Sequence, residues 1–275
     1  MLIVLLFIGA VGGFLAGLIG IGGGVIFGPA LFFVFQAAGV PDPVLTPLTL
    51  GSSLLCTFAA SASGAVAQHA KGAIDWRTAL VAGGLSAVVG VLAAVFISTQ
   101  PWYDKQVFQI VLGLVLSVVV VRMLTKRASG DAARDNSLST EGAQRGLARL
   151  AGTGLAAGSL ASLAGVGGGV VLVPAFNAFV KLPLKVAAGT STMAIVLITG
   201  CLTIAYAILG LGAAVPEGAV GYVGWQSSLV LALPAIVTAR LGVSAAHRLD
   251  VRIVRYAFAA LAAFVAARLL WNALG

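Results

Sequence analysis

The chain reads Ile19-Gly20-Ile21-Gly22-Gly23-Gly24-Val25 close to its start, with Pro29 shortly after. The pattern returns as Ala164-Gly165-Val166-Gly167-Gly168-Gly169-Val170, with Pro174 in the same relative place. Both copies keep one constant offset, so Gly22 matches Gly167 and Pro29 matches Pro174. A duplicated pattern at a fixed offset indicates a chain built from two related halves.

The composition around both copies excludes a water-soluble domain. Of 275 residues, 60% are hydrophobic and 9% are charged, and the mean hydropathy is +1.10. Soluble domains carry about 25% charged residues, because their surface must be wetted. Many apolar runs approach the roughly 20 residues that a membrane-spanning helix needs. The sequence therefore predicts an all-α polytopic membrane protein that lies in a lipid bilayer.

The apolar segments fall into two sets of five. In the first half they are 2–19, 24–38, 46–67, 78–98 and 106–124, and in the second half they are 149–164, 169–180, 186–209, 223–246 and 252–272. The second segment of each half is short, and either dips into the membrane or crosses it. We expect a first transmembrane repeat over 1–125, a polar linker over 126–148, and a second repeat over 149–275.

The net charge of +8 admits two interpretations, nucleic-acid binding or basic connections between membrane helices. The second is favoured because the basic residues lie in the connections, and basic connections face the cytoplasm. The linker, with Lys126, Arg127 and Arg134, is then cytoplasmic. Counting crossings forward and backward from it puts the other basic connections on the same side. Because five segments per half is an odd number, the second repeat is inverted, as in many transporters.

The glycine runs are the first candidate site. Gly22, Gly23 and Gly24, and their counterparts Gly167, Gly168 and Gly169, interrupt helices inside the membrane. A broken helix survives there only against protein or a wet cavity. The helix that restarts after the break offers free N–H groups and a positive dipole end, which favour an anion. The alternative is that the glycines serve close helix packing.

Hydroxyl residues follow each break at matching positions. Gly51-Ser52-Ser53 in the first half corresponds to Gly189-Thr190-Ser191 in the second. Ser52, Ser53, Thr190 and Ser191 can donate to an anion without bringing a permanent charge into the bilayer. The alternative is that these side chains bond back to the preceding helical turn, which is common for Ser and Thr.

Charged and metal-binding side chains are scarce in the apolar segments. All eight acidic residues lie in connections, so the segments offer no carboxylate relay for protons or cations. Cys56 and Cys201 make no disulfide or metal pattern and are expected to be buried. We expect no metal, no cofactor and no enzymatic activity. Arg240 is the deepest basic residue; it either extends to the interface or guides an anion at the cytoplasmic mouth.

These residues together resemble the TauE/SafE sulfite exporter, or anion permease, family. The resemblance covers about residues 5–272. It is carried by the paired glycine motifs with Pro29 and Pro174, the Gly-Ser-Ser and Gly-Thr-Ser segments, His69-x-Lys71-Gly72-x-Ile74-Asp75-Trp76, and Arg240-Leu241-Gly242 leading to His247-Arg248-Leu249 and Arg255. The chain departs from the usual pattern in having Ser52 where its second half has Thr190.

The resemblance implies a carrier in the cell inner membrane that exports small anions, among them sulfite, thiosulfate or organosulfonates. Alternating access around the paired glycine breaks is the expected mechanism, and a passive anion channel is the alternative. The expected partners are the anion and the lipid bilayer, with no nucleic acid. A homodimer is the candidate assembly.

Overall fold

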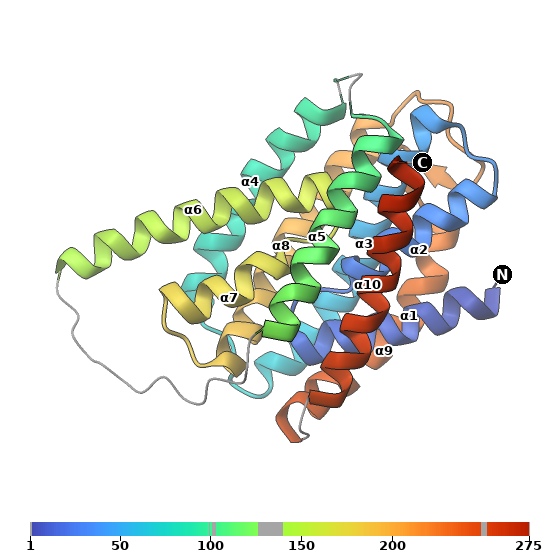
Figure 1. Ribbon diagram of the computed structural model, residues 1–275. Coiled ribbons are helices and arrows are strands. Elements are labelled where there is room, and N and C mark those ends of the chain that lie inside the picture. Colours follow the sequence, from blue (N-terminus) through green and yellow to red (C-terminus); the bar gives the residue numbers. More distant parts are fainter. Residues whose placement is uncertain (1, 99, 101–102, 126–139, 249–251, 275) are drawn as a thin grey trace.

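The computed structural model describes residues 2–98, 100, 103–125, 140–248 and 252–274. Side chains are not described at 122, 123, 125, 140–151, 247, 248, 252–258, 261 and 274. The described chain folds into helices, with one very short strand pair (Figure 1). The predicted linker falls outside the description at 126–139.

Each predicted apolar segment corresponds to one helix. The first five are α1 (Leu2–Ile19), α2 (Gly24–Ala37), α3 (Asp42–His69), α4 (Trp76–Ser98) and α5 (Lys105–Thr125). The second five are α6 (Thr140–Ala164), α7 (Gly169–Phe179), α8 (Leu184–Leu209), α9 (Trp225–Arg248) and α10 (Arg252–Leu274). Helix α6 starts inside the predicted linker, because Ala143, Gln144 and Leu147 are good helix formers. The antiparallel strands β1 (Ala219–Val220) and β2 (Val223–Gly224) were not expected.

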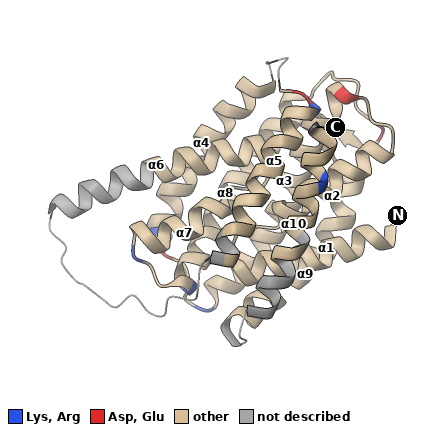
Figure 2. Cartoon of the chain, in the orientation of Figure 1, with Lys and Arg blue, Asp and Glu red and all other residues tan. Residues whose placement is uncertain are grey.

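Several of these helices have the length and composition of membrane spans. Helices α1, α3, α4 and α8 do, as does Trp225–Ala246 within α9. Helix α2 has 14 residues and α7 has 11, or about 21 and 17 Å, against a hydrocarbon core of about 30 Å. Neither short helix can cross that core alone. In Figure 2 most of the described charged residues lie toward two opposite ends of the helical body, with few between.

Helix α3 lies at the centre of the molecule. In its most apolar window 78% of residues are buried, against 33–44% in the other four candidate spans. It packs against α8, α9 and α2. Buried phenylalanines on neighbouring helices, among them Phe27, Phe32 and Phe108, fill the core around it. Residues on the faces of α3 are thus well placed to line an interior site.

Four further helix pairs join the two halves of the described chain. Helix α1 packs against α9, and α6 packs against α4. Helix α8 packs against α4, and α5 lies beside α10 (Figure 1). Because every one of these contacts runs between the halves, the halves form one body rather than two separate domains.

The two cysteines have different environments. Cys56 on α3 is buried, and its thiol donates to the carbonyl oxygen of Ser228 over 3.4 Å. Cys201 on α8 is exposed, so the expectation of a buried thiol is wrong there. The position faces outward because Leu202, its neighbour in sequence, takes the inward direction on the helix.

Candidate functional site

The two glycine breaks lie against each other in the interior. A methyl group at Gly24 would come within 2.6 Å of the carbonyl oxygen of Gly165. A methyl group at Gly169 would come within 2.3 Å of the carbonyl oxygen of Ile21. Every residue of Gly20–Val25 and Gly165–Val170 is buried. The tertiary structure therefore brings together the two runs that the sequence keeps far apart.

Left-handed backbone ends the incoming helices at both breaks. Gly20 has a φ of +74° and Gly22 of +76°, while Gly165 and Gly167 have +66° and +77°. Gly168 repeats this conformation with a φ of +77°, whereas Gly23 is right-handed at −79°. Glycine is the residue that tolerates a positive φ, so these positions depend on it.

Each break leads into an uncapped helix N-terminus. In α2 the first backbone bonds run from Ile26 and Phe27 to the Gly23 carbonyl, and in α7 they run from Val171 and Leu172 to the Gly168 carbonyl. The N–H groups before them have no intrahelical acceptor. Neither N-terminus has a side-chain cap or an acidic residue in its first turn. Two positive dipole ends therefore adjoin in a buried place, which favours an anion.

Facing sides of α3 and α8 enclose the breaks. A methyl group at Gly20 would lie 2.7 Å from the Ala188 carbonyl oxygen, and one at Gly165 would lie 3.1 Å from Leu50 Cδ2. Further along the same faces, Thr57 on α3 and Ile195 on α8 both lie close to Gly22 and to Gly167. We call this space between α3, α8 and the two breaks the seam.

The seam contains hydroxyl residues that the sequence analysis did not select. Thr57 Cγ2 would lie 3.1 Å from a methyl group at either Gly22 or Gly167. Thr199 Cγ2 would lie 3.0 Å from a methyl group at Gly167, and its hydroxyl donates to the Ile195 carbonyl. Thr57 follows Ser53 by one helical turn, and Thr199 follows Ser191 by two turns. This spacing along the same helix faces was the signal that could have identified them.

The predicted residues Ser53 and Ser191 differ in their bonding. Ser53 donates to the Gly165 carbonyl over 3.0 Å, and so caps the C-terminal end of α6. Two tyrosine hydroxyls donate to carbonyls near the same end of α6. Tyr206 donates to the Ser162 carbonyl, and Tyr103 donates to the Leu163 carbonyl. Burial, with Tyr206 close by, raises the pKa of Tyr103 well above its usual value, so that it stays a donor. The Ser191 hydroxyl is buried and has no recorded partner in the described chain.

The predicted residues Ser52 and Thr190 bind the backbone. Ser52 Oγ accepts the Gly224 N–H over 2.9 Å, directly before α9 begins. Thr190 Oγ1 accepts the Asp75 N–H over 2.9 Å, directly before α4 begins. Each hydroxyl thus positions the start of a long helix. Both side chains are fully buried.

Arg240 lies apart from the glycine breaks. Its Nε donates to Ser63 Oγ over 3.0 Å, and Ser63 donates in turn to the Ile236 carbonyl. Ser63 is six residues beyond Thr57 on α3, or about 9 Å along the helix axis. The structure therefore brings Arg240 to the seam's helix but not to the break itself.

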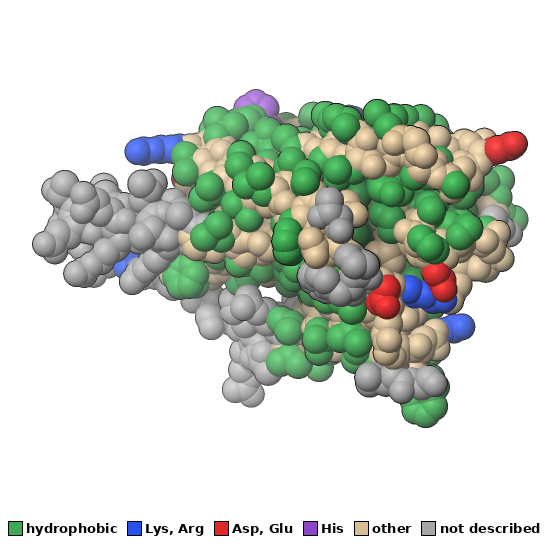
Figure 3. Space-filling model, turned by 90° about the horizontal axis from the view of Figure 1, so that it is seen from above, with side chains coloured by type: hydrophobic (Ala, Val, Ile, Leu, Met, Phe, Trp, Pro, Cys, Tyr) green, Lys and Arg blue, Asp and Glu red, His purple; other side chains and the backbone are tan. Residues whose placement is uncertain are grey.

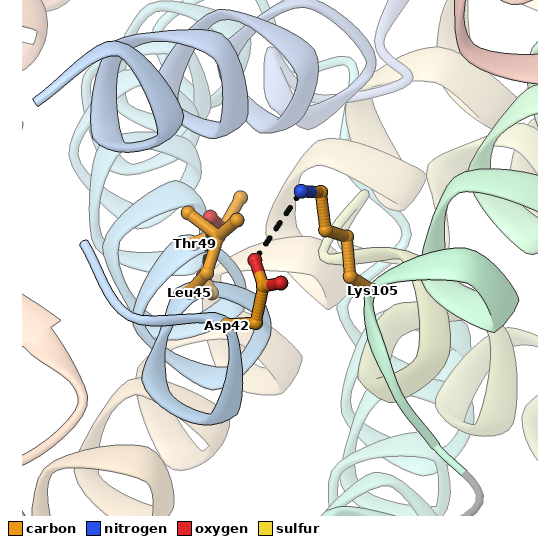
Figure 4. A network of polar contacts seen from close by, with 4 residues as sticks. All are labelled: Asp42, Leu45, Thr49 and Lys105. Atoms are coloured by element: carbon orange, nitrogen blue, oxygen red, sulfur yellow. Dashed lines mark hydrogen bonds and ion pairs between the residues drawn. The ribbon is translucent and has the colours of Figure 1, made fainter. Parts of the chain in front are cut away.

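A cavity of about 780 Å³ opens at the end of the molecule where α3, α5 and the connection after α4 meet. Its mouth holds an ion pair between Lys105 Nζ and Asp42 Oδ1 at 3.2 Å (Figure 4). Figure 3 looks onto this end, where a few charged side chains lie among apolar and uncharged ones. Leu50 and Tyr206 also line the cavity. Because Leu50 contacts the second break, the cavity extends toward the seam.

Comparison with known proteins identifies the family. The family model described as "Sulfite exporter TauE/SafE" matches residues 5–269, which is nearly the whole chain. The chain belongs to the TauE/SafE family. This confirms the resemblance that the glycine motifs indicated. No solved structure matches the chain.

Relatives match the chain along most of their length. A protein of Haemophilus influenzae is 28% identical over 258 residues, covering 92% of each chain. One of Methanocaldococcus jannaschii is 28% identical over 240 residues, covering 87% of this chain and 84% of its own. One of Bacillus subtilis is 24% identical over 263 residues, covering 91% and 90%. All three are described as probable membrane transporters. The TauE/SafE chain described here is accordingly a multi-pass membrane transporter and not an enzyme.

Proposed function

We propose that this chain is a secondary transporter of small anions, which bind between the two glycine breaks. The observation that carries the proposal is the pair of adjoining, buried and uncapped helix N-termini of α2 and α7. Buried N–H groups without acceptors are rare in proteins, and an anion satisfies them. Gly22–Gly24 and Gly167–Gly169 then form the binding site, and Ser191 supplies a hydroxyl.

We further propose that the halves 1–125 and 149–275 are inverted repeats, which permit alternating access. The helix pairs support this. The counterparts are α1 and α6, α3 and α8, α4 and α9, and α5 and α10. Exchanging counterparts turns the α1–α9 contact into an α6–α4 contact, and the α3–α9 contact into an α8–α4 contact. All four of these contacts are present. The pairs α3–α8 and α5–α10 map onto themselves. Such a pattern is expected around a two-fold axis through the breaks.

The cavity supports access from one side. It runs from the Lys105–Asp42 ion pair to Leu50, which touches the second break. By the positive-inside rule its mouth is on the side away from the cytoplasm, because the basic connections lie opposite. Thr46, which lines the cavity, is a further buried hydroxyl without a recorded partner in the described chain.

The family description favours sulfur-containing substrates, such as sulfite, thiosulfate or organosulfonates, and outward transport. The proposed location is the cell inner membrane, with the linker in the cytoplasm. We propose that the protein forms a homodimer. Chemical crosslinking in the membrane would test this assembly.

Reconstitution into lipid vesicles tests the proposal. Purified protein is expected to mediate saturable uptake of labelled sulfite or a labelled organosulfonate, with empty vesicles as the control. Preloading the vesicles with unlabelled anion is expected to accelerate uptake by counterflow. Absence of any protein-dependent anion flux would overturn the proposal.

A passive anion channel is the second candidate, because it shares the buried N-termini. A channel conducts without saturating at low substrate and shows no counterflow. Flux that rises linearly with anion concentration and ignores preloading would favour the channel over alternating access.

A further inference from the structure

Buried hydroxyls without partners gather on the helices of the seam. In the described chain, the buried side-chain oxygens with no recorded hydrogen bond belong to Thr46, Thr57, Ser61 and Ser191. Three of these, Thr57, Ser61 and Ser191, are at most 1% exposed. Most buried hydroxyls in proteins are hydrogen-bonded, so a cluster of unbonded ones requires an explanation.

Thr57 is the central member of this group. Its methyl carbon Cγ2 lies against Gly22 of the first break and Gly167 of the second, and its hydroxyl, on the same Cβ atom, has no partner in the described chain. Ser61 follows one helical turn later on the same face of α3. Other threonines nearby are satisfied locally, since Thr49 donates to Leu45 (Figure 4) and Thr199 donates to Ile195. The absence of such a local bond singles out Thr57.

By helical periodicity, Ser191 lies on the face of α8 that carries Ala188 and Ile195. It lies between Ala188, which contacts Gly20, and Ile195, which contacts Gly22. Its counterpart in the first half, Ser53, is occupied by the Gly165 carbonyl. The two halves are therefore unequal at this point, and the free hydroxyl is on the α8 side.

Among the described residues, those nearest to the glycines of the breaks are uncharged. Every atom recorded closest to Gly22, Gly23, Gly24 and to their counterparts belongs to an uncharged residue. Arg240, on the adjoining helix α9, donates to Ser63, which lies beyond these hydroxyls on α3. Transfer of an ion from water into a low-dielectric interior costs free energy that rises with the square of its charge. The helix dipoles and neutral hydroxyls at the breaks can offset this desolvation cost far more readily for a singly charged anion than for a doubly charged one.

We propose that Thr57, Ser61 and Ser191 donate to a singly charged oxyanion, which the glycine breaks hold from the other side. This inference rests on the proposed function and narrows it. Hydrogensulfite and simple organosulfonates are the favoured class, and doubly charged sulfite, sulfate and thiosulfate are disfavoured.

Two probes of equal shape test the charge. Methanesulfonate carries one charge at mildly alkaline pH, and methylphosphonate, which has the same tetrahedral form, carries two. Binding to the purified full-length chain is measured by thermal shift and by calorimetry, together with sulfite, thiosulfate and sulfate. Methanesulfonate is expected to bind at least about tenfold more tightly than methylphosphonate and sulfate. Equal or tighter binding of the doubly charged probes would overturn the inference and leave the proposed function standing.

A pair of matched variants tests the hydroxyls. Thr57→Val keeps the side-chain shape and removes an unpartnered hydroxyl, so the unliganded melting temperature should not fall. Its affinity for methanesulfonate should fall about tenfold or more, the loss of one hydrogen bond to a charged group. Thr49→Val on the same helix is the control and should bind normally. Ser191→Ala should resemble Thr57→Val.

The outcomes separate the two claims. If anions bind and are transported but Thr57→Val and Ser191→Ala both bind as tightly as the native chain, the hydroxyl assignment is wrong, including the role of Ser191, while anion transport by way of the glycine breaks stands. If no anion in the panel binds or is transported by the native chain, the proposed function fails, and the inference fails with it.

Discussion

At the scale of single residues, the glycines of the breaks have two separate physical tasks. Gly22, Gly167 and Gly168 adopt a positive φ. Gly24 and Gly169 allow the backbone of one break to approach the backbone of the other. The sequence showed that these glycines are paired, but their division into these two tasks follows only from the contacts.

Gly169→Ala is expected to be destabilising. The added methyl group would lie 2.3 Å from the Ile21 carbonyl oxygen, and a backbone atom cannot move aside without shifting the whole break. Overpacking of this kind costs roughly 1–3 kcal/mol. We expect a lower melting temperature and loss of anion transport, measured in detergent and in vesicles.

Gly84→Ala in α4 is the matched control, because a methyl group there meets no atom within 4 Å. Alanine at this helical position should leave the protein as stable or slightly more stable, by up to about 1 kcal/mol. If Gly169→Ala transported anions at the native rate, the close contact between the breaks would not describe the working protein.

At the scale of helices, two hydroxyls position the starts of α4 and α9. Thr190 holds Asp75 before Trp76, and Ser52 holds Gly224 before Trp225. Gly189 and Gly51 make room for these connections, since a methyl group at either would lie about 2 Å from a carbonyl oxygen, that of Ala73 or of Tyr222. Both helices therefore begin against the partner half, at equivalent places.

Ser52→Ala is expected to lower stability rather than anion affinity. The change leaves the buried Gly224 N–H without its acceptor, which costs about 1–3 kcal/mol. The melting temperature should fall, while the dissociation constant for a bound anion, measured by calorimetry below the transition, should stay near the native value.

Ser117→Ala is the control. In the described chain, the Ser117 hydroxyl donates to the Gly113 carbonyl of its own helix, and the loss of this bond should matter little. A Ser52→Ala protein with native stability but weakened anion binding would instead make Ser52 a direct ligand, as its position in the sequence suggested.

At the scale of the whole molecule, the arrangement of the halves decides where equivalent connections lie. Lys71 stands between α3 and α4, and Glu217 stands in the corresponding connection between α8 and α9. Inverted repeats place these two exposed positions on opposite sides of the membrane. Parallel repeats would place them on the same side.

Cysteine labelling in intact cells distinguishes the two arrangements. The exposed Cys201 is first replaced by serine, while the buried Cys56 is kept. Glu217→Cys should react with a membrane-impermeant maleimide from outside, and Lys71→Cys should react only after the cells are opened. Asp104→Cys, next to the cavity mouth, should behave like Glu217→Cys. Labelling of both Lys71→Cys and Glu217→Cys from outside would contradict inversion.

Much of the architecture follows from the sequence alone. The long apolar segments and the low content of charged residues indicate a membrane protein. These segments must be helical in lipid, because a helix satisfies its own backbone hydrogen bonds. The repeated glycine pattern determines where helices stop and restart, because glycine is the residue that permits the required backbone. The same repeated glycine pattern indicated the family and showed that the chain contains two matching breaks.

The tertiary structure alone decided which side chains reach the breaks. Ser52, Ser53 and Thr190 stood at the most suggestive positions in the sequence, yet backbone groups from distant segments occupy them. Thr57 looked like an ordinary buried threonine, yet its methyl group touches both breaks, and its hydroxyl has no partner in the described chain. Helical periodicity gives the face on which a residue lies, but the partner that meets this face depends on how α3 and α8 pack, and packing is a property of the whole chain.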